Sequence, residues 1–183
     1  HATDFITPKS EVSRLFRDAT LDLAKTHLFA RALVNSGRLS VPATLRDSPL
    51  NTPDDAEFAG AMRPGAAAAD APVQADGQPG WLLRHLHAGY FTALLFGGDE
   101  LATTVRELRA AAQGLASLQV LIVVPAGSSA RVDGARTLVD AQDLLSQRYD
   151  GKHGTLYLLR PDQHVCARWR RTQREPLRQA LRR

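Results

Sequence analysis

Residues 154–170, GTLYLLRPDQHVCARWR, contain the clearest structural pattern in this chain. An apolar run lies on each side of the residues Arg160-Pro161-Asp162-Gln163. Proline suits the second position of a turn, and an aspartate after it can hydrogen-bond its own backbone. The pattern therefore predicts an antiparallel hairpin of two buried strands. Cys166, the single cysteine, lies in the second strand, which raises the question of whether it is an active-site thiol or part of the core.

The residues around the hairpin continue an α/β pattern. We predict, in order, a helical turn over 82–87, a strand over 90–96, a helix over 100–112, a strand over 118–124, a helix over 138–149 and a final helix over 175–182. Both predicted strands before the hairpin are almost continuously apolar, as strands covered on two faces are. A strand–helix–strand unit implies a parallel pair with a right-handed crossover. A parallel pair followed by an antiparallel hairpin, in the order β-α-β-α-β-β-α, predicts a thioredoxin-like α/β domain.

A thioredoxin-type enzyme needs a cysteine at the start of the helix that follows the first strand, where the helix dipole stabilises a thiolate. This chain has Gly97-Gly98-Asp99-Glu100 there, and we expect Asp99 to cap the helix. Two carboxylates disfavour a thiolate. Lys152-His153-Gly154 replaces the usual cis-proline before the hairpin, and a mid-strand thiol such as Cys166 is generally an inert small apolar group. We predict the fold without its redox site.

Metal and nucleotide sites are not indicated either. His85 and His87 point apart on a helical turn, and His164, Cys166 and Arg168 are expected to share one strand face without a further metal ligand. The chain has no G-x-G-x-x-G and no G-x-x-x-x-G-K motif. We therefore predict no catalytic, no cofactor-binding and no metal-binding residue.

The first part of the chain is predicted to be helical from Thr7-Pro8, a cap and first-turn pair, to a stop at Gly37, with a possible break at Thr26-His27. Its apolar positions recur at helical spacing and form one stripe: Val12, Leu15, Phe16, Ala19 and Leu23. Such a stripe must be buried, either on the later domain or on an upstream one. Residues 38–80 contain six prolines and are interpreted as a linker, partly disordered over 51–61.

Composition narrows the setting of the protein. The 183 residues carry a net charge of +4, with seven arginines among the last sixteen residues. This cluster is interpreted as a solvated helix face or as a contact for acidic groups, and no row of aromatic residues accompanies it to indicate nucleic-acid binding. There is no apolar run long enough to span a membrane and no signal-peptide pattern. One cysteine fits a reducing compartment, so we expect a cytoplasmic protein.

The hairpin resembles a family signature. GTLYLLRPDQHVCARWR is similar to the "yL(V/L)RPDghVaaRW" motif near the C-terminus of class A flavoprotein monooxygenases, the FAD-dependent aromatic hydroxylases of the phenol hydroxylase and 3-(3-hydroxyphenyl)propionate hydroxylase kind. TPKSEVSRLFRDATLDLAK and ARALVNSGRLSVPATLRDSPL resemble the helix and "SGRLS" stretch after their flavin-binding core. MRPGAAAADAPV is similar to the "lrPGarapdapl" entrance to their C-terminal thioredoxin-like domain, although peroxiredoxins begin similarly.

The resemblance implies a C-terminal fragment, and the first residue, His1, is consistent with an excised piece, processing or a tag remnant. Residues 1–50 would be the helical tail of a flavoprotein substrate domain, 51–62 a linker and 63–183 the thioredoxin-like domain. The longer enzyme would use FAD and NAD(P)H to hydroxylate a phenolic ring, whereas this chain would bind neither and would be inactive alone. Its partners would be the upstream FAD-binding domain and a second copy in a homodimer.

Two other readings remain open. In one alternative, the chain is a free-standing, non-catalytic thioredoxin-like module that holds an acidic partner with its arginine-rich C-terminus. In the other, it is a degenerate peroxiredoxin, which the missing cysteine disfavours. The aromatic substrate and the oligomeric state are not determined by the sequence.

Overall fold

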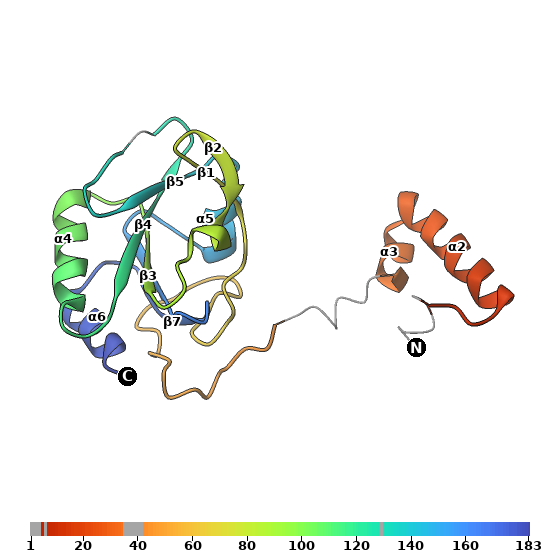
Figure 1. Ribbon diagram of the computed structural model, residues 1–183, viewed down its shortest axis with the longest axis horizontal. Helices are drawn as coiled ribbons and strands as arrows, with labels where there is room; N and C mark the ends of the chain where they lie inside the picture. The colour runs from red at the N-terminus through yellow and green to blue at the C-terminus, as the bar shows by residue number, and fades with distance from the viewer. Residues whose placement is uncertain (1–4, 6, 35–41, 129) are drawn as a thin grey trace. The chain divides into compact units, whose positions relative to one another are not determined.

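The computed structural model describes residues 5, 7–34, 42–128 and 130–183, and the chain divides into two compact units, His1–Pro42 and Ala43–Arg183 (Figure 1). The elements are α2 (Glu11–Thr26), α3 (Leu28–Val34), β1 (Pro72–Ala75), β2 (Gln78–Trp81), the 3-10 turn η1 (Leu82–His85), β3 (Phe91–Phe96), α4 (Leu101–Ala112), β4 (Leu118–Pro125), β5 (Arg136–Asp140), α5 (Leu144–Tyr149), β6 (Thr155–Leu159), β7 (Val165–Trp169) and α6 (Arg174–Leu181). The predicted division at residues 50 and 62 stays a prediction.

The described residues of the first unit include the helices α2, of 16 residues, and α3, of 7 residues. The expected cap at Thr7 is wrong, because α2 begins after Ser10, whose side chain accepts the Ser13 N–H at 3.1 Å. The break is confirmed: His27 is extended, with φ −118°, and separates α2 from α3. The expected stop at Gly37 lies outside the described residues. In the described part of the chain, no helix combines the length and the apolar character needed to cross a bilayer.

The apolar stripe of α2 has little to pack on within this unit. Its large side chains are exposed, from 47% for Leu23 to 78% for Val12, with Leu15 and Phe16 between these values. Thr20, by contrast, is buried and donates its hydroxyl to the Phe16 carbonyl at 2.7 Å. An amphipathic helix of this kind is stabilised mainly by covering its apolar face.

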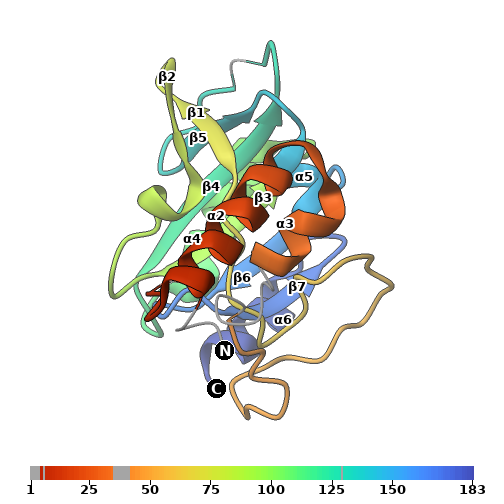
Figure 2. The same ribbon diagram turned by 90° about the vertical axis from the view of Figure 1, so that its right-hand side faces the viewer.

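The second unit is built on one seven-stranded sheet with the order β2-β1-β5-β4-β3-β6-β7 (Figure 2). β3 and β4 pair in parallel, as do β4 and β5, while β3–β6 and β6–β7 are antiparallel. The predicted parallel pair, the hairpin and the thioredoxin-like α/β class are confirmed.

Helices cover both faces of the sheet (Figure 1). α4 and α6 lie on one face, where Leu108 and Leu177 join the apolar cluster that includes Trp169. α5 lies on the opposite face, where Leu145 and Tyr149 belong to a second cluster. Both faces of the central strands are therefore buried, which explains their continuous apolar runs.

The predicted helix over 138–149 is wrong in its first half. Arg136–Asp140 forms β5, which pairs with β4 in register Val123↔Leu138, and α5 begins only at Leu144. Thr137 and Val139 are β-branched and favour an extended backbone. The burial of this run against β4 therefore outweighs its helical spacing.

The N-terminal edge of the sheet was not anticipated. Within the expected linker, β1 and β2 form a hairpin whose turn residues, Asp76 and Gly77, have φ of +53° and +76°. Two successive residues with positive φ are the turn geometry that matches the twist of paired strands, and Asp-Gly is a favoured pair for it.

Residues 45–68, here called the edge segment, run along β7. Thr52 N–H donates to the Cys166 carbonyl, Gly65 N–H donates to the Val165 carbonyl and Val165 N–H donates to the Ala66 carbonyl, each at 2.8 Å. The expected partial disorder of 51–61 is therefore wrong. The edge segment satisfies backbone groups that an outer strand otherwise exposes.

Candidate functional site

The position of a thioredoxin-type cysteine is occupied by the turn between β3 and α4. Gly97, Gly98 and Glu100 all have positive φ, and Glu100 precedes the helix without a side-chain cap bond. The Asp99 side chain is 97% exposed, so the expectation that it caps α4 is wrong. The reason is local: the left-handed Glu100 starts the helix, and the carboxylate before it points to solvent.

A surface cavity of about 500 Å³ opens beside this turn and is lined by Leu95, Gly98, Asp99, Thr104, His153, Gly154, Arg171 and Thr172. The imidazole Nε2 of His153 lies 3.8 Å from Asp99 Oδ1, and both side chains are largely exposed. Such a pair is worth little in water. Gly154 N–H donates to the Phe96 carbonyl at 2.7 Å, and the described backbone contains no cis peptide bond in the place of the usual cis-proline. The cavity has no thiol in its lining.

Cys166 lies near the turn of the β6–β7 hairpin, whereas Gly154 and Arg171 of this cavity lie at the open end of the hairpin. It is the extra residue of a bulge, because β6 residues Leu158 and Leu159 pair with Ala167 and Val165. Its side chain is 1% exposed and its thiol donates to the Leu50 carbonyl at 3.2 Å. Burial raises the pKa of Cys166 to about 11. A thiol in this state is a packing group and not a nucleophile at neutral pH.

The bulge corrects one prediction about β7. Cys166 and Ala167 both belong to the cluster under α4 and α6, whereas Arg168 reaches Phe58 and Asp54. Cys166 and Arg168 therefore do not share a face, because the extra residue interrupts the two-residue alternation of the strand.

No described group of His, Cys, Asp and Glu residues is arranged to bind a metal. His164 Nδ1 lies 3.1 Å from the Asp162 carbonyl, within the turn. His85 is partly buried, and burial followed by the charge of Arg136 lowers the pKa of its imidazole. Its Nε2 is buried and has no hydrogen-bond partner.

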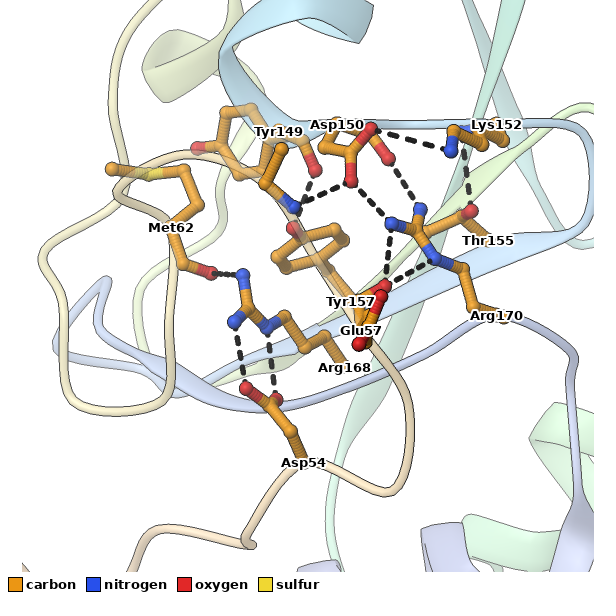
Figure 3. Close-up of polar contacts among 11 residues, drawn as sticks. Asp54, Glu57, Met62, Tyr149, Asp150, Lys152, Thr155, Tyr157, Arg168 and Arg170 are labelled. Carbon is orange, nitrogen blue, oxygen red and sulfur yellow. Dashed lines mark hydrogen bonds and ion pairs between the residues drawn. The ribbon is translucent and has the colours of Figure 1, made fainter.

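The strongest polar cluster instead joins β7 to the edge segment (Figure 3). Arg168 donates from Nε and Nη2 to the two carboxylate oxygens of Asp54, at 2.9 Å and 2.6 Å, and from Nη1 to the Met62 carbonyl at 3.1 Å. The Arg168 side chain is 5% exposed, so the fork-to-fork pair is largely removed from solvent. A buried guanidinium is tolerated only when it is paired in this way.

Arg170 makes the second link. Its Nε and Nη2 donate to the Glu57 carbonyl at 3.1 Å and 2.9 Å, and it also pairs with the Asp150 carboxylate (Figure 3). The Phe58 ring lies under both guanidinium carbons, 4.4 Å from Arg168 Cζ and 3.8 Å from Arg170 Cζ. Cation–π contacts of this kind add to the ion pairs.

Asp150 connects this cluster to the end of α5. Burial alone would raise its pKa, but hydrogen bonds from Arg170 and from the Ala59 N–H outweigh burial and hold the pKa of Asp150 below its usual range. Tyr157 donates its hydroxyl to the Tyr149 carbonyl nearby. Burial raises the pKa of Tyr149 far above its ordinary value and also raises the pKa of Tyr157. Neither phenol is therefore ionised at neutral pH.

The arrangement is suited to holding a chain segment in place. Each guanidinium is matched by a carboxylate and by at least one backbone carbonyl, and no metal-ligand group was found among the residues that the structure describes. Asp54, Glu57 and Phe58 contact these two arginines and were not anticipated, because they lie in the expected linker. The acidic run PDDAE over 53–57 was the one available signal.

Comparison with known proteins supports the fold. No protein-family model and no curated protein sequence matches the chain. Among solved structures, it is similar to the flavin-dependent monooxygenase PieE, solved with FAD and substrate, with a TM-score of 0.61 and 20% identity over 98% of this chain and 31% of that one. Aklavinone-11 hydroxylase, solved with FAD and aklavinone, matches with a TM-score of 0.51 and 24% identity over 71% of this chain and 24% of that one.

Thioredoxin-type structures also match. A protein described as the thiol:disulfide interchange protein DsbE from Chlorobium tepidum gives a TM-score of 0.52 and 14% identity, over 66% of this chain and 96% of that one. All these identities are below 25%, so the comparisons establish a mixed α/β, thioredoxin-like fold. The chain spans about a third of the length of PieE, 31%, and about a quarter of aklavinone-11 hydroxylase, 24%.

Proposed function

We propose that this chain is the C-terminal part of an FAD- and NAD(P)H-dependent monooxygenase that hydroxylates a phenolic or other aromatic ring. Its thioredoxin-like domain is redox-inactive and contributes to stability and subunit assembly. The protein works in the cytoplasm.

One observation carries the proposal. The similarity to PieE covers 98% of this chain, whereas the similarity to the DsbE protein covers 66% of it while using 96% of that protein. The match to PieE therefore includes residues of this chain that the match to the DsbE protein does not cover. The hairpin motif of residues 154–170 supports the same origin.

The chain's own residues do not fit a flavin. The described residues include no glycine-rich strand-to-helix turn of the dinucleotide-binding type, and the Gly97-Gly98 turn is followed by the carboxylates of Asp99 and Glu100, which repel a diphosphate. We therefore assign no residue here to FAD, to NAD(P)H or to the aromatic substrate.

The α2 stripe supports a partner for the first unit. Val12, Leu15 and Phe16 are exposed on a helix that is expected to bury them. We propose that the upstream FAD-binding domain of the same protein covers this stripe, and that the complete enzyme is a homodimer.

A flavin titration tests the proposal. The purified chain should leave the fluorescence and the visible spectrum of FAD unchanged across the micromolar range, because the flavin site belongs to the upstream part. Saturable micromolar binding would mean that the chain itself holds a flavin site, and the assignment as a non-catalytic C-terminal part would be withdrawn.

A thiol assay separates this proposal from the degenerate peroxiredoxin. In the native chain, Cys166 should react with an aromatic disulfide reagent many times more slowly than after unfolding in urea, because the thiol is buried and its pKa is about 11. Labelling as fast as that of the unfolded chain would show an accessible thiolate and favour the peroxiredoxin reading.

A further inference from the structure

One side of α6 carries a line of arginines. Arg174, Arg178 and Arg182 are four residues apart, which places them about 6 Å from one another along the helix axis. Arg171 precedes the helix at a similar spacing. An adjacent face of α6 packs into the core through Leu177 and Ala180, and α6 lies beside α4 (Figure 1).

Within the described residues, Glu175 on α6 is the acidic residue closest in sequence to this line, four positions after Arg171 and three before Arg178. No ion pair involves Arg171, Arg174 or Arg182, and all three residues are exposed. Arg178 donates a hydrogen bond from Nη1 to the Ala111 carbonyl at 3.3 Å.

The positive charge of the chain is concentrated in its last sixteen residues. Residues 168–183 contain seven arginines and one acid, Glu175, although the whole chain has a net charge of only +4. Residues 1–167 are therefore net acidic. Arg168 and Arg170 form ion pairs with Asp54 and Asp150. The other arginines of this stretch lie on α6 or beside it.

Like charges four residues apart destabilise a helix, because their side chains are neighbours on its surface. In the described part of the chain, Arg174 and Arg182 form no ion pair, so their guanidinium groups are free to bind anions of another molecule. Guanidinium groups form two-pronged hydrogen bonds with carboxylates. α6 has no aromatic residue, and Trp169 before it is buried, so the stacking surfaces typical of single-stranded nucleic-acid sites are missing from this helix.

We propose that the α6 arginine stripe, formed by Arg171, Arg174, Arg178 and Arg182, docks an acidic segment of a partner protein. The segment presents carboxylates about 6 Å apart, as glutamates one helical turn apart do. This docking surface goes beyond the proposed function and does not depend on it, because a flavoprotein part and a free-standing module would both present it.

The test uses the whole chain and a fluorescein-labelled peptide of ten glutamates, with binding followed by fluorescence anisotropy at low salt. We expect saturable binding that weakens as salt is added. The variant R171Q/R174Q/R182Q should bind at least tenfold more weakly.

The matched control is R46Q/R84Q/R131Q, which removes three exposed arginines elsewhere and the same total charge. It should bind the peptide within about twofold of the unchanged chain if the stripe is the site. A ten-nucleotide oligothymidylate, which carries a similar charge, should bind more weakly than the peptide.

Thermal unfolding separates docking from a structural role. Removing like charges from α6 should leave the Tm unchanged or raise it, whereas arginines needed for folding would lower it on substitution. The proposal is overturned if the stripe variant keeps its peptide affinity, if the control loses as much affinity as the stripe variant, or if the oligonucleotide binds more tightly, which would indicate a nucleic-acid surface.

Discussion

Cys166 shows how one residue alters the surroundings of its neighbours. Because it is the extra residue of the β6–β7 bulge, Arg168 turns away from the thiol and toward the edge segment. The thiol is left between the Leu50 carbonyl and the core. A regular strand would have placed the arginine beside the cysteine, where it could have lowered the thiol pKa.

The ionisation of Asp150 should affect the stability of the fold, because its carboxylate is hydrogen-bonded to Arg170. Hydrogen bonds from Arg170 and the Ala59 N–H lower its pKa in the folded chain against the effect of burial. A carboxyl with a lowered folded pKa stabilises the fold above its ordinary pKa, and this contribution is lost as the pH falls through the folded pKa. We expect D150N to be less stable by about 1–3 kcal/mol at neutral pH. The deficit should shrink below about pH 4.

Urea unfolding at neutral and acidic pH measures this difference. Asparagine tolerates the left-handed backbone of Asp150, whose φ is +46°, so the substitution removes the charge without adding strain. D99N is the control, because the Asp99 carboxylate is exposed and should leave stability unchanged at both pH values. A deficit of D150N that persisted unchanged at acid pH would contradict the assigned ion pair.

At the scale of elements, β5 and α5 show how a turn divides one apparent helix into two elements. Asp140 ends β5, is 1% exposed, and its carboxylate accepts the N–H groups of Leu145 at 3.2 Å and Ser146 at 2.7 Å. Asp143 directly precedes α5 but makes no side-chain cap bond. Asp140, four residues before the start of α5, therefore accepts hydrogen bonds from the otherwise free N–H groups in the first turn of this helix.

We predict that D140A destabilises the chain by about 1–3 kcal/mol, since two N–H groups at the start of a helix lose their acceptor. D143N should be nearly neutral, because asparagine keeps the positive φ and no cap bond is lost. Denaturant unfolding curves of both variants measure this contrast. Equal losses would mean that the carboxylate of Asp143 supports α5 as well.

At the scale of the molecule, the two units differ in what they bury. Residues 43–183 contain both apolar clusters, the complete sheet and the edge segment, whereas the first unit exposes most of the α2 stripe. A unit with its own core is expected to fold alone.

We predict that residues 43–183, prepared without residues 1–42, unfold in one cooperative transition. The free energy of unfolding should lie within about 0.5 kcal/mol of that measured for the complete chain. Urea unfolding followed by far-UV circular dichroism and by tryptophan fluorescence compares the two. A large loss of stability, or a loss of cooperativity, would show that the first unit supports the thioredoxin-like domain.

Local patterns predicted the centre of the fold. β3, α4, β4 and the β6–β7 hairpin were all anticipated, because long apolar runs, helical spacing and turn residues act over neighbouring positions. The absence of a thiol at the start of α4 was likewise visible, since it depends on which residues occupy 97–100.

Contacts between distant residues accounted for the rest. β1, β2 and β5 lack the continuous apolar runs of β4 and β6, and they become strands because neighbouring strands supply hydrogen bonds and burial. Arg168 and Asp54 are 114 positions apart, so no local pattern relates them. The amino-acid order was therefore sufficient for the fold class and for the absence of a cysteine at residues 97–100. The edge segment and its arginine pairs depended on the folded sheet, because charges so far apart in the chain meet only when the backbone between them has packed.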